Sequence, residues 1–560
     1  MTPGERVRAA YRAIAAVDRP EIWISLRPEA DALADAATVD PASPLAGTVV
    51  AVKDNVAVRG LRTTAGCPTF GTVATADAPA VARLRAAGAV VIGTTNLDQF
   101  ATGLVGTRSP HGPVRDARRP DRISGGSSSG SAVAVALGLV DIAVGTDTAG
   151  SGRVPAALQG IVGIKPTPGV VPTEGVVPAC RSWDCLTVMA RDLPTAEAAM
   201  GVMAGGARSW PADTPLAAPP VPRVAVPHGL PSLPTAWDAV IGSLDAARIE
   251  AVPIDIGPFL EAARLLYDGG LVAERHAAVG GFVDTHPHDV DPVVAAIIGS
   301  AGGIPASRYV TDIARLAELR AAAMAALAGL DALLLPTVIE HPTIAEVAAD
   351  PVGVNTRLGT YTNFCNLFDL SAVAVPAGTM GDAQFGVTVL GRPFADAVVA
   401  DIARRIMIPT TPPRLQAGGL PEPVTTAVPW PITAGAAAVP LVVVGAHRRG
   451  QPLAAELERR GACWDGMVRT APTYRLLALD TVPPKPGLVR APDGAAIVGE
   501  RWMISPAGLG TLLAELPPPM LLGPVELADG TWNVGFGCAA DVTGEDITSA
   551  GDWLATLRPG

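Results

Sequence analysis

Three segments of the chain carry side chains that could together attack a carbonyl carbon. Ser151 lies between two glycines in GTDTAGSGRVPA (145–156), Ser127 lies in GGSSSGS (125–131), and Lys53 lies in AVKDN. The 560-residue chain has seven histidines, and none is in these segments. A lysine becomes a base when burial keeps its amine neutral. Lys53, Ser127 and Ser151 could therefore pass a proton along a serine–lysine relay, while backbone N–H groups near the glycines stabilise an oxyanion.

The serine-rich segments allow three other interpretations. A flexible Ser/Gly linker is disfavoured because the buried pattern SAVAVALGLVDIAVGTD (131–147) follows directly. A phosphate-binding loop would need GxxxxGK[ST], and the chain has no such string. GSSSG (126–130) matches the G-x-S-x-G elbow of α/β-hydrolases with Ser128 at its centre, but the RRPDRI before it is typical of a loop, whereas the elbow follows a strand. Only the relay uses all three segments.

Alternating helix and strand patterns surround these residues. GTVVAVKDNVAV (47–58) predicts a buried strand, and AVARLRAAGAVVIGTTN (80–96) predicts a helix that ends at Gly88 and then a strand. Residues 131–147 repeat the helix–strand pattern. Such alternation predicts an α/β fold with helices on both faces of a sheet that has many parallel neighbours. Further buried strand candidates are ALAGLDALLLPT (326–337) and LFDLSAVAVPAG (367–378).

The length of the chain predicts two or three domains, and one stretch marks a boundary. Residues 411–440 are crowded with Pro, Gly and Ala, cannot sustain a helix, and predict an extended linker. We therefore expect a first domain over residues 1–410 and a smaller α/β or β-rich domain over residues 441–560, which opens with the strand pattern LVVVGAH.

Composition narrows the class of protein. The net charge of −11 argues against a nucleic-acid-binding surface. The chain has no apolar run of about 18 or more residues, so no transmembrane helix is predicted. The N-terminal residues lack the apolar core of a signal peptide. The six cysteines lack metal-ligand spacing, and Cys180 and Cys185 are expected to be reduced core thiols. We therefore expect a soluble, cytoplasmic protein with no membrane contact and no metal or other cofactor.

The string GGSSSGSAVAVALGLVDIAVGTDTAGSGRVPAALQGIVGIKPT (125–167) resembles the signature of the amidase signature family of serine hydrolases. The resemblance covers about residues 45 to 400. It implies a large mixed β-sheet flanked by helices on both faces. It also implies that Lys53 is the base, that Ser127 is the bridging serine after a cis peptide bond, and that Ser151 is the nucleophile.

The resemblance also assigns roles to the residues around Ser151. Asp147 and Arg153 are expected to brace the loop. Many family members have two glycines where this chain has Ala149-Gly150, and alanine keeps the N–H group although its backbone is more restricted. The expected oxyanion hole consists of the backbone N–H groups of Thr148, Ala149, Gly150 and Ser151.

Segments outside that signature resemble the allophanate hydrolases. These segments are PEIWISLRPEADALADA (20–36), LLYDGGLVAERHAAV (265–279), NTRLGTYTNFCNLFDLSAVAVPAG (355–378) and the tail LVVVGAHRRGQPLAAELERRGA (441–462). The resemblance implies hydrolysis of allophanate, a small anionic amide, to ammonia and carbon dioxide, as the second step of ATP-dependent urea degradation. It also implies a homodimer and a functional association with urea carboxylase.

A cation is needed to hold an anionic substrate in an acidic protein. Tyr267 and Arg275 match the pair that recognises the substrate in the allophanate hydrolases. Without the resemblance, Arg275 would be interpreted as half of a helix-surface ion pair with Glu274 or Asp268. Gly103, in ATGLVG, is a candidate lining residue of the pocket near Lys53.

The tail resembles the second domain of allophanate hydrolases, which is similar to the γ-glutamylcyclotransferase-like fold. His447 is its only histidine and could assist decarboxylation of the reaction intermediate, but a structural histidine beside a glycine turn or an assembly role for the domain also fits. Two rival functions remain for the whole chain. One is another small-molecule amidase, acting on malonamate or biuret, and the other is an amidase-like subunit that is active only in a complex.

Overall fold

The structure, a computed structural model, describes residues 1–228, 235–409, 428–539 and 541–557. Contacts divide the chain into two compact units, Met1–Ser209 with Val221–Thr426 and Trp210–Pro220 with Ala427–Gly560. The segment Trp210–Pro220 thus leaves the first unit and packs with the second, which the sequence did not indicate.

The domain limits expected from the sequence stay a prediction. Residues 410–427 of the predicted linker lie outside the described residues. The rest of that linker is not fully extended, because α16 (Trp430–Thr433) is a short helix. Pro431 lies in its first turn, where a missing N–H group costs no hydrogen bond. The expectation that residues 411–440 cannot form a helix is therefore wrong at this point.

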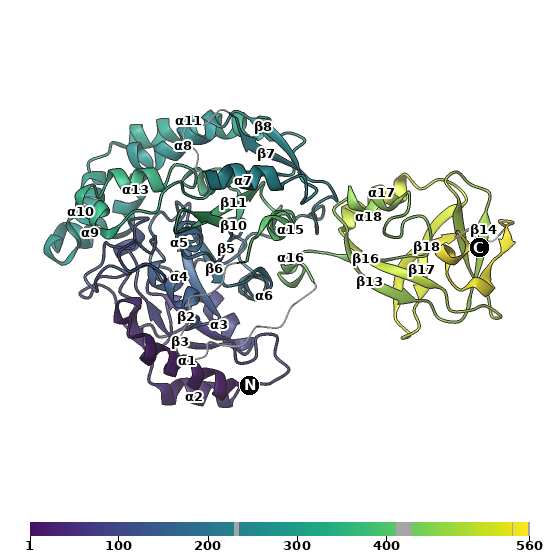
Figure 1. Cartoon of the computed structure of the whole chain (residues 1–560), viewed down its shortest axis with the longest axis horizontal. Helices are drawn as coiled ribbons and strands as arrows, with labels where there is room; N and C mark the ends of the chain where they lie inside the picture. Colours follow the sequence, from purple (N-terminus) through teal and green to yellow (C-terminus); the bar gives the residue numbers. More distant parts are fainter. Residues whose placement is uncertain (229–234, 410–427, 540, 558–560) are drawn as a thin grey trace. The chain divides into compact units, whose positions relative to one another are not determined.

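The first unit is built on one mixed sheet (Figure 1). The strand order is β1-β3-β2-β4-β6-β5-β10-β11-β9-β7-β8. β2 runs parallel to β3 and β4, and β7 runs parallel to β8 and β9, whereas the other neighbours are antiparallel. The predicted large mixed sheet is confirmed. Its strands are β1 (Trp23–Leu26), β2 (Val49–Lys53), β3 (Val90–Thr95), β4 (Ile142–Asp147), β5 (Val162–Lys165), β6 (Cys185–Ala190), β7 (Arg223–Pro227), β8 (Glu250–Ile254), β9 (Ala332–Pro336), β10 (Ser371–Met380) and β11 (Ala383–Gly391).

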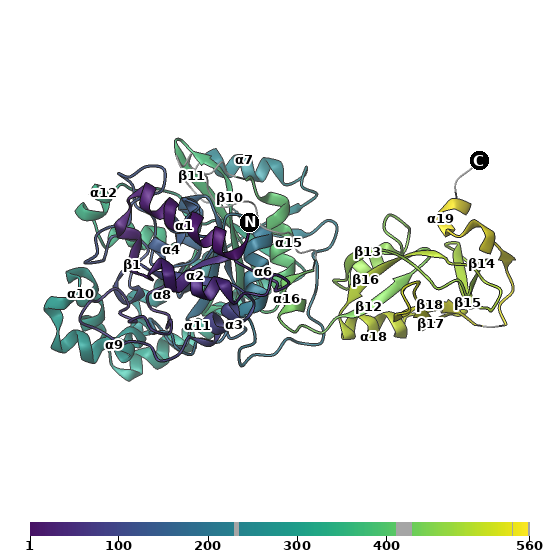
Figure 2. The same ribbon diagram turned by 90° about the horizontal axis from the view of Figure 1, so that it is seen from below.

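Helices cover this sheet (Figure 1 and Figure 2). Small apolar side chains of α1, α2 and α4 pack with β2 and β3 in one buried cluster. The helices of the unit are α1 (Pro3–Val17), α2 (Glu29–Ala37), α3 (Pro79–Ala86), α4 (Ser129–Ala136), α5 (Arg153–Gln159), α6 (Leu193–Met203), α7 (Thr235–Ser243), α8 (Gly257–Asp268), α9 (Ala273–Thr285), α10 (Pro292–Ala301), α11 (Ala306–Ala326), α12 (Ile344–Ala349), α13 (Gly353–Leu358), α14 (Phe364–Leu367) and α15 (Asp396–Ile406).

Two buried strands and one small-residue helix bring the reactive segments together. β2 and β4 are buried along their whole length and run side by side, so that Lys53 and Asp147 end neighbouring strands. Every residue of α4 is buried. A Cβ atom at Gly145 would lie 2.8 Å from Ser128 Oγ, so a larger residue there would displace the Ser128 hydroxyl at the start of α4. The helix–strand patterns predicted over 80–96 and 131–147 are confirmed by α3, β3, α4 and β4.

The second unit contains two smaller sheets. One has the order β13-β16-β12-β18-β17 and the other β15-β14-β19. Besides α16, its helices are α17 (Ala454–Glu458), α18 (Pro506–Ala514) and α19 (Trp553–Thr556). Its strands are β12 (Val439–Val443), β13 (Cys463–Arg469), β14 (Tyr474–Leu479), β15 (Lys485–Arg490), β16 (Val498–Ile504), β17 (Met520–Glu526), β18 (Trp532–Cys538) and β19 (Glu545–Asp546).

In the part of the chain that the structure describes, no single helix is long and apolar enough to cross a membrane. α10 and α11 pass by length and composition only as a pair, with a bend of 95° between them.

Candidate active site

Lys53 lies at the end of β2 with its side chain fully buried. Its Nζ lies 2.8 Å from Ser127 Oγ and 2.7 Å from Thr146 Oγ1, and donates to both hydroxyls. The peptide bond between Gly126 and Ser127 is cis, as predicted. The structure therefore brings together two of the three residues of the predicted relay.

Burial controls the charge of Lys53. Because the low-dielectric interior disfavours the ammonium form, the pKa of Lys53 falls to about 7, although the carboxylates of Asp98, Asp147 and Asp184 favour that form. Arg275 adds to the lowering. A substantial fraction of the amine is thus neutral near pH 7 and able to accept a proton.

Ser151 lies in the turn between β4 and α5 and is 2% exposed. The Ser128 N–H donates to the Ser151 carbonyl oxygen at 3.3 Å, which ties the two serine segments together through the backbone. Among the described residues, no hydrogen bond joins the hydroxyls of Ser127 and Ser151. The second link of the predicted relay stays a prediction.

The turn around Ser151 is held by a buried ion pair. Arg153 donates from Nε to Asp147 Oδ2 at 3.0 Å and from Nη2 to Oδ1 at 2.9 Å. Burial alone would raise the pKa of the Asp147 carboxyl, but the Arg153 guanidinium holds that pKa below its usual range. The structure thus gives Asp147 and Arg153 the bracing contacts expected from the sequence.

The same carboxylate corrects the predicted oxyanion hole. The Gly150 N–H donates to Asp147 Oδ1 at 2.9 Å, so it is not available to a substrate oxygen. Within the described residues, the N–H groups of Thr148, Ala149 and Ser151 have no protein acceptor. The prediction is therefore wrong for Gly150 and stays a prediction for the other three. Gly150 has φ +129°, and an added Cβ would meet Thr362 Oγ1 at 2.5 Å, so glycine is needed there for conformation and space.

Arg275 is almost completely buried at the start of α9. It donates from Nη1 to Thr102 Oγ1 at 2.9 Å and from Nη2 to the Tyr267 hydroxyl at 3.0 Å. In the described part of the chain it has no carboxylate within salt-bridge distance, although Asp184 acts on it from further away, and its Nε has no hydrogen-bond partner. Glu274 instead accepts hydrogen bonds from the Ser182 N–H and the Tyr309 hydroxyl. The alternative of an ion pair with Glu274 or Asp268 is therefore wrong.

Sequence reasoning missed several residues of the site. In the stretch 101–106, the Ala101 carbonyl and the Thr102 hydroxyl accept hydrogen bonds from Arg275. A Cβ atom at Gly103 would meet Asp98 Oδ2, so Gly103 packs against Asp98, and its role as a lining residue of the pocket stays a prediction. Thr146 belongs to the same motif as Ser151 and lies on the same strand as Asp147, so the motif itself could have identified it.

Asp184, just before β6, was also missed. It accepts hydrogen bonds from the Thr148 hydroxyl at 2.5 Å, from the Ala179 N–H at 2.9 Å and from the Cys180 N–H at 3.2 Å. Burial raises the pKa of its carboxyl, and these hydrogen bonds and Arg275 oppose the rise. Asp184 therefore joins the loop that carries Ser151 to the segment before β6.

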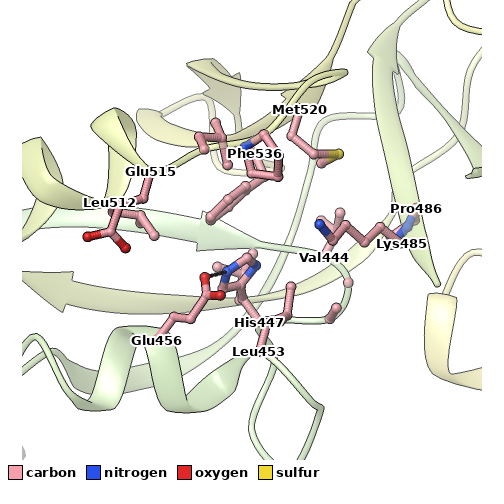
Figure 3. A pocket seen from close by; sticks show the side chains of 15 residues that line it. Val444, His447, Leu453, Glu456, Lys485, Pro486, Leu512, Glu515, Met520 and Phe536 are labelled. Atoms are coloured by element: carbon pink, nitrogen blue, oxygen red, sulfur yellow. Dashed lines mark hydrogen bonds and ion pairs between the residues drawn. The ribbon is translucent and has the colours of Figure 1, made fainter. Parts of the chain in front are cut away.

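His447 lies in the second unit, where it lines a cavity of about 180 Å³ (Figure 3). Its Nε2 lies 2.9 Å from Glu456 Oε2, and its ring stacks on Phe536 with centroids 4.3 Å apart. Burial lowers the pKa of His447, and Glu456 opposes that effect. Lys485 lines the same cavity. Among the described residues, no group of three or more His, Cys, Asp or Glu side chains is arranged to hold a metal ion.

Models of known protein families match the chain over most of its length. The family model described as Amidase matches residues 5–399. The chain belongs to the amidase family. A second model, the allophanate hydrolase C-terminal domain, matches residues 439–558 of this amidase. Both sequence resemblances are thereby confirmed.

Individual relatives agree with these matches. The amidase resembles the solved structure of Kluyveromyces lactis allophanate hydrolase with a TM-score of 0.88 and 36% identity, over 100% of this chain and 97% of that one. It is 41% identical to urea amidolyase of Lachancea kluyveri over 88% of its own length, but spans only 28% of that relative. It is also 35% identical to a Glutamyl-tRNA(Gln) amidotransferase component from Thermus thermophilus, over 70% of this chain and 90% of that relative.

Proposed function

We propose that this amidase hydrolyses allophanate, with Ser151 as nucleophile, Ser127 as bridging serine and Lys53 as base. The observation that most directly supports this substrate is the buried position of Arg275. Among the described residues, Asp184 acts on this buried guanidinium only from beyond salt-bridge distance, so a substrate anion would add compensation, and the Nε without a hydrogen-bond partner offers a bond to a carboxylate. The similarity to Kluyveromyces lactis allophanate hydrolase over the whole chain supports the same substrate.

The proposed reaction begins at the terminal carbamoyl carbon. Arg275 and Tyr267 hold the carboxylate end of the substrate. Ser151 Oγ bonds to the carbon as its proton passes through Ser127 to Lys53, and the N–H groups of Thr148, Ala149 and Ser151 stabilise the oxyanion. The C–N bond then breaks, and the leaving nitrogen takes the proton back and departs as ammonia.

Water completes the cycle. It gives a proton to Lys53 through the same relay as its oxygen bonds to the acyl carbon. The bond from that carbon to Ser151 Oγ then breaks, the proton returns from Lys53 to Ser151 Oγ, and N-carboxycarbamate is released. Protonation of the nitrogen of this product allows one carbon dioxide to leave, and the remaining carbamate breaks down to a second ammonia and carbon dioxide. Each allophanate thus yields two ammonia and two carbon dioxide molecules.

We further propose that the cavity of the second unit binds the carboxylated product. Lys485 offers a cation for a carboxylate, and His447, oriented by Glu456 and kept neutral by burial, can relay a proton from water to the nitrogen. Substitution of His447 by Asn should delay carbon dioxide release while leaving the first ammonia unchanged. A variant that releases both gases at the original rates would leave the cavity with a structural or assembly role.

We also propose a cytoplasmic homodimer that works in association with a urea carboxylase. Two relatives are named urea amidolyase, and this chain spans 28% of their length. The free thiols Cys67, Cys180, Cys185, Cys365 and Cys538 suit a reducing compartment. Mass measurement in solution tests the dimer, since a monomer at working concentration would contradict it.

The decisive experiment is the ammonia yield with allophanate, biuret, malonamate and malonamide as substrates. We expect two ammonia molecules per allophanate, and loss of this activity in Ser151→Ala with the fold retained. No ammonia from allophanate but turnover of another amide would favour a different small-molecule amidase. No turnover by the purified chain, restored by a partner, would favour a component of a complex, as the Thermus thermophilus relative would suggest.

A further inference from the structure

Thr146 contacts the same nitrogen as Ser127. Its Oγ1 lies 2.7 Å from Lys53 Nζ, slightly closer than Ser127 Oγ at 2.8 Å, and the residue is 2% exposed. Two hydroxyls therefore compete for one buried amine. Only one of them can give its proton to the lone pair of the neutral form.

The two hydroxyls differ in what else they contact. Thr146 Oγ1 also accepts a hydrogen bond from Asn55 Nδ2 at 3.3 Å, so two donors point at its oxygen. Ser127 Oγ has no other hydrogen-bond partner among the described residues. Thr146 is therefore arranged as an acceptor, which leaves Ser127 to donate to Lys53.

Thr146 is also fixed to both segments that must meet. Asn55 lies two residues after Lys53. On the other side, the Ser128 hydroxyl donates to the Thr146 carbonyl oxygen at 3.1 Å and accepts from the Thr146 N–H at 3.3 Å. The residue after Ser127 thus pairs with both backbone groups of Thr146. A displacement of this threonine would disturb the Lys53 side and the Ser127 side together.

We infer that Thr146 is a positioning residue, which accepts one N–H of the Lys53 amine and so directs the lone pair of that amine toward Ser127. A neutral primary amine has two N–H groups and one lone pair, so anchoring one N–H restricts where the lone pair points. The inference rests on the proposed serine–lysine chemistry but not on the choice of substrate. No bond of the reaction forms at Thr146.

The test uses the full chain and a small fluorophosphonate, which phosphonylates an activated serine with loss of fluoride. Ser151 should be labelled whichever amide is the natural substrate, because labelling needs only the nucleophile and its base.

Three variants are compared. Thr146→Val removes the hydroxyl at nearly constant volume, Thr146→Ser retains it, and Thr187→Val is the control. Thr187 is a buried threonine on β6 opposite Gly145, and its hydroxyl has no hydrogen-bond partner within the described ranges.

We expect Thr146→Val to lower the plateau rate of labelling by roughly 10- to 100-fold, as for misplaced catalytic groups. The acid limb of the pH profile should also move to lower pH. Removing the acceptor costs the ammonium form more hydrogen-bond energy than the neutral amine, so the pKa of Lys53 falls. Thr146→Ser should restore both, and Thr187→Val should match the original protein. The charged groups that act on Lys53, which no variant changes, are Asp98, Asp147, Asp184 and Arg275.

Other outcomes are distinguishable. An unchanged plateau in Thr146→Val overturns the inference, as does a loss that is equal at all pH values or that Thr146→Ser does not restore. If the labelling pattern holds but allophanate is not hydrolysed, the proposed substrate fails and the role of Thr146 stands. If allophanate is hydrolysed but Thr146→Val behaves like Thr187→Val, the reverse is true.

Discussion

Arg153 and Asp147 form a bidentate ion pair in which both side chains are completely buried. Asp147 uses the same carboxylate to accept the N–H groups of Gly150 and Gly152, on either side of Ser151. The pair therefore holds the shape of the nucleophile loop, because one partner ends the strand before that loop and the other begins the helix after it.

Removing the guanidinium should destabilise the fold. Arg153→Met leaves a buried carboxylate without its partner, and we expect a loss of about 3–5 kcal/mol in the free energy of unfolding. Denaturant unfolding measures it. Arg315→Met, which breaks exposed pairs with Glu261 and Glu318, is the matched control and should change little. Equal losses in the two variants would contradict the prediction.

The activity should rise with pH through the pKa of Lys53. Below about pH 7 the ammonium form predominates and has no lone pair, so kcat/KM should fall toward acid and level off above about pH 8. Lys53→Met should lower activity by roughly 10²–10⁴-fold at every pH. A rate profile that keeps its full value at pH 5 would show that another group is the base.

The same pKa predicts a pH dependence of stability. The folded pKa of about 7 lies below the unfolded value near 10.5, so between these values the unfolded chain binds more protons. The unfolding free energy should therefore rise with pH in this window. Lys53→Met lacks the titrating group, so its unfolding free energy should fall relative to that of the original protein from pH 7 to pH 9. Parallel curves for the two proteins would contradict a depressed pKa.

Arg275 should determine selectivity for an anionic substrate. Arg275→Gln removes the charge, and we expect kcat/KM for allophanate to fall roughly 100-fold, the equivalent of one charged hydrogen bond. Neutral malonamide should be affected much less. Tyr267→Phe removes one acceptor of Arg275 and one hydroxyl proposed to hold the carboxylate, but it keeps the positive charge and should have a smaller effect. If both substrates lose equally, Arg275 holds the fold and not the carboxylate.

Asp184 should affect turnover more than binding. Asp184→Ala leaves the Thr148 hydroxyl and two backbone N–H groups without their acceptor, which should loosen one wall of the oxyanion hole. We expect kcat to fall about 10-fold with KM nearly unchanged. This is less than the roughly 10²–10³-fold loss in kcat when one oxyanion-hole donor is removed completely. A higher KM at unchanged kcat would place Asp184 in substrate binding instead.

The sequence predicted the parts of the site that lie within short motifs or follow strand periodicity. Lys53 could be located because a valine-rich strand ends there, and Ser127 because it precedes a helix of small residues. The Thr146 contact, the partners of Glu274 and the Thr148–Asp184 hydrogen bond could not, because each joins segments whose approach depends on the whole sheet. Gly150 was misassigned because a motif shows which N–H groups are near Ser151 but not which of them a carboxylate already occupies.

Trp210 has a consequence for how the protein is made. Its ring meets that of Trp430 edge to face at 5.4 Å, and its Nε1 donates to the Ala434 carbonyl oxygen. The segment Trp210–Pro220 leaves the ribosome long before Trp430, and at ordinary synthesis rates the delay is roughly 10–40 s. During that time Trp210 lacks the ring of Trp430 and the carbonyl oxygen of Ala434. A shortened chain that stops at residue 410 would keep Trp210 without these two contacts, and a fragment that starts at 441 would lack the whole segment Trp210–Pro220.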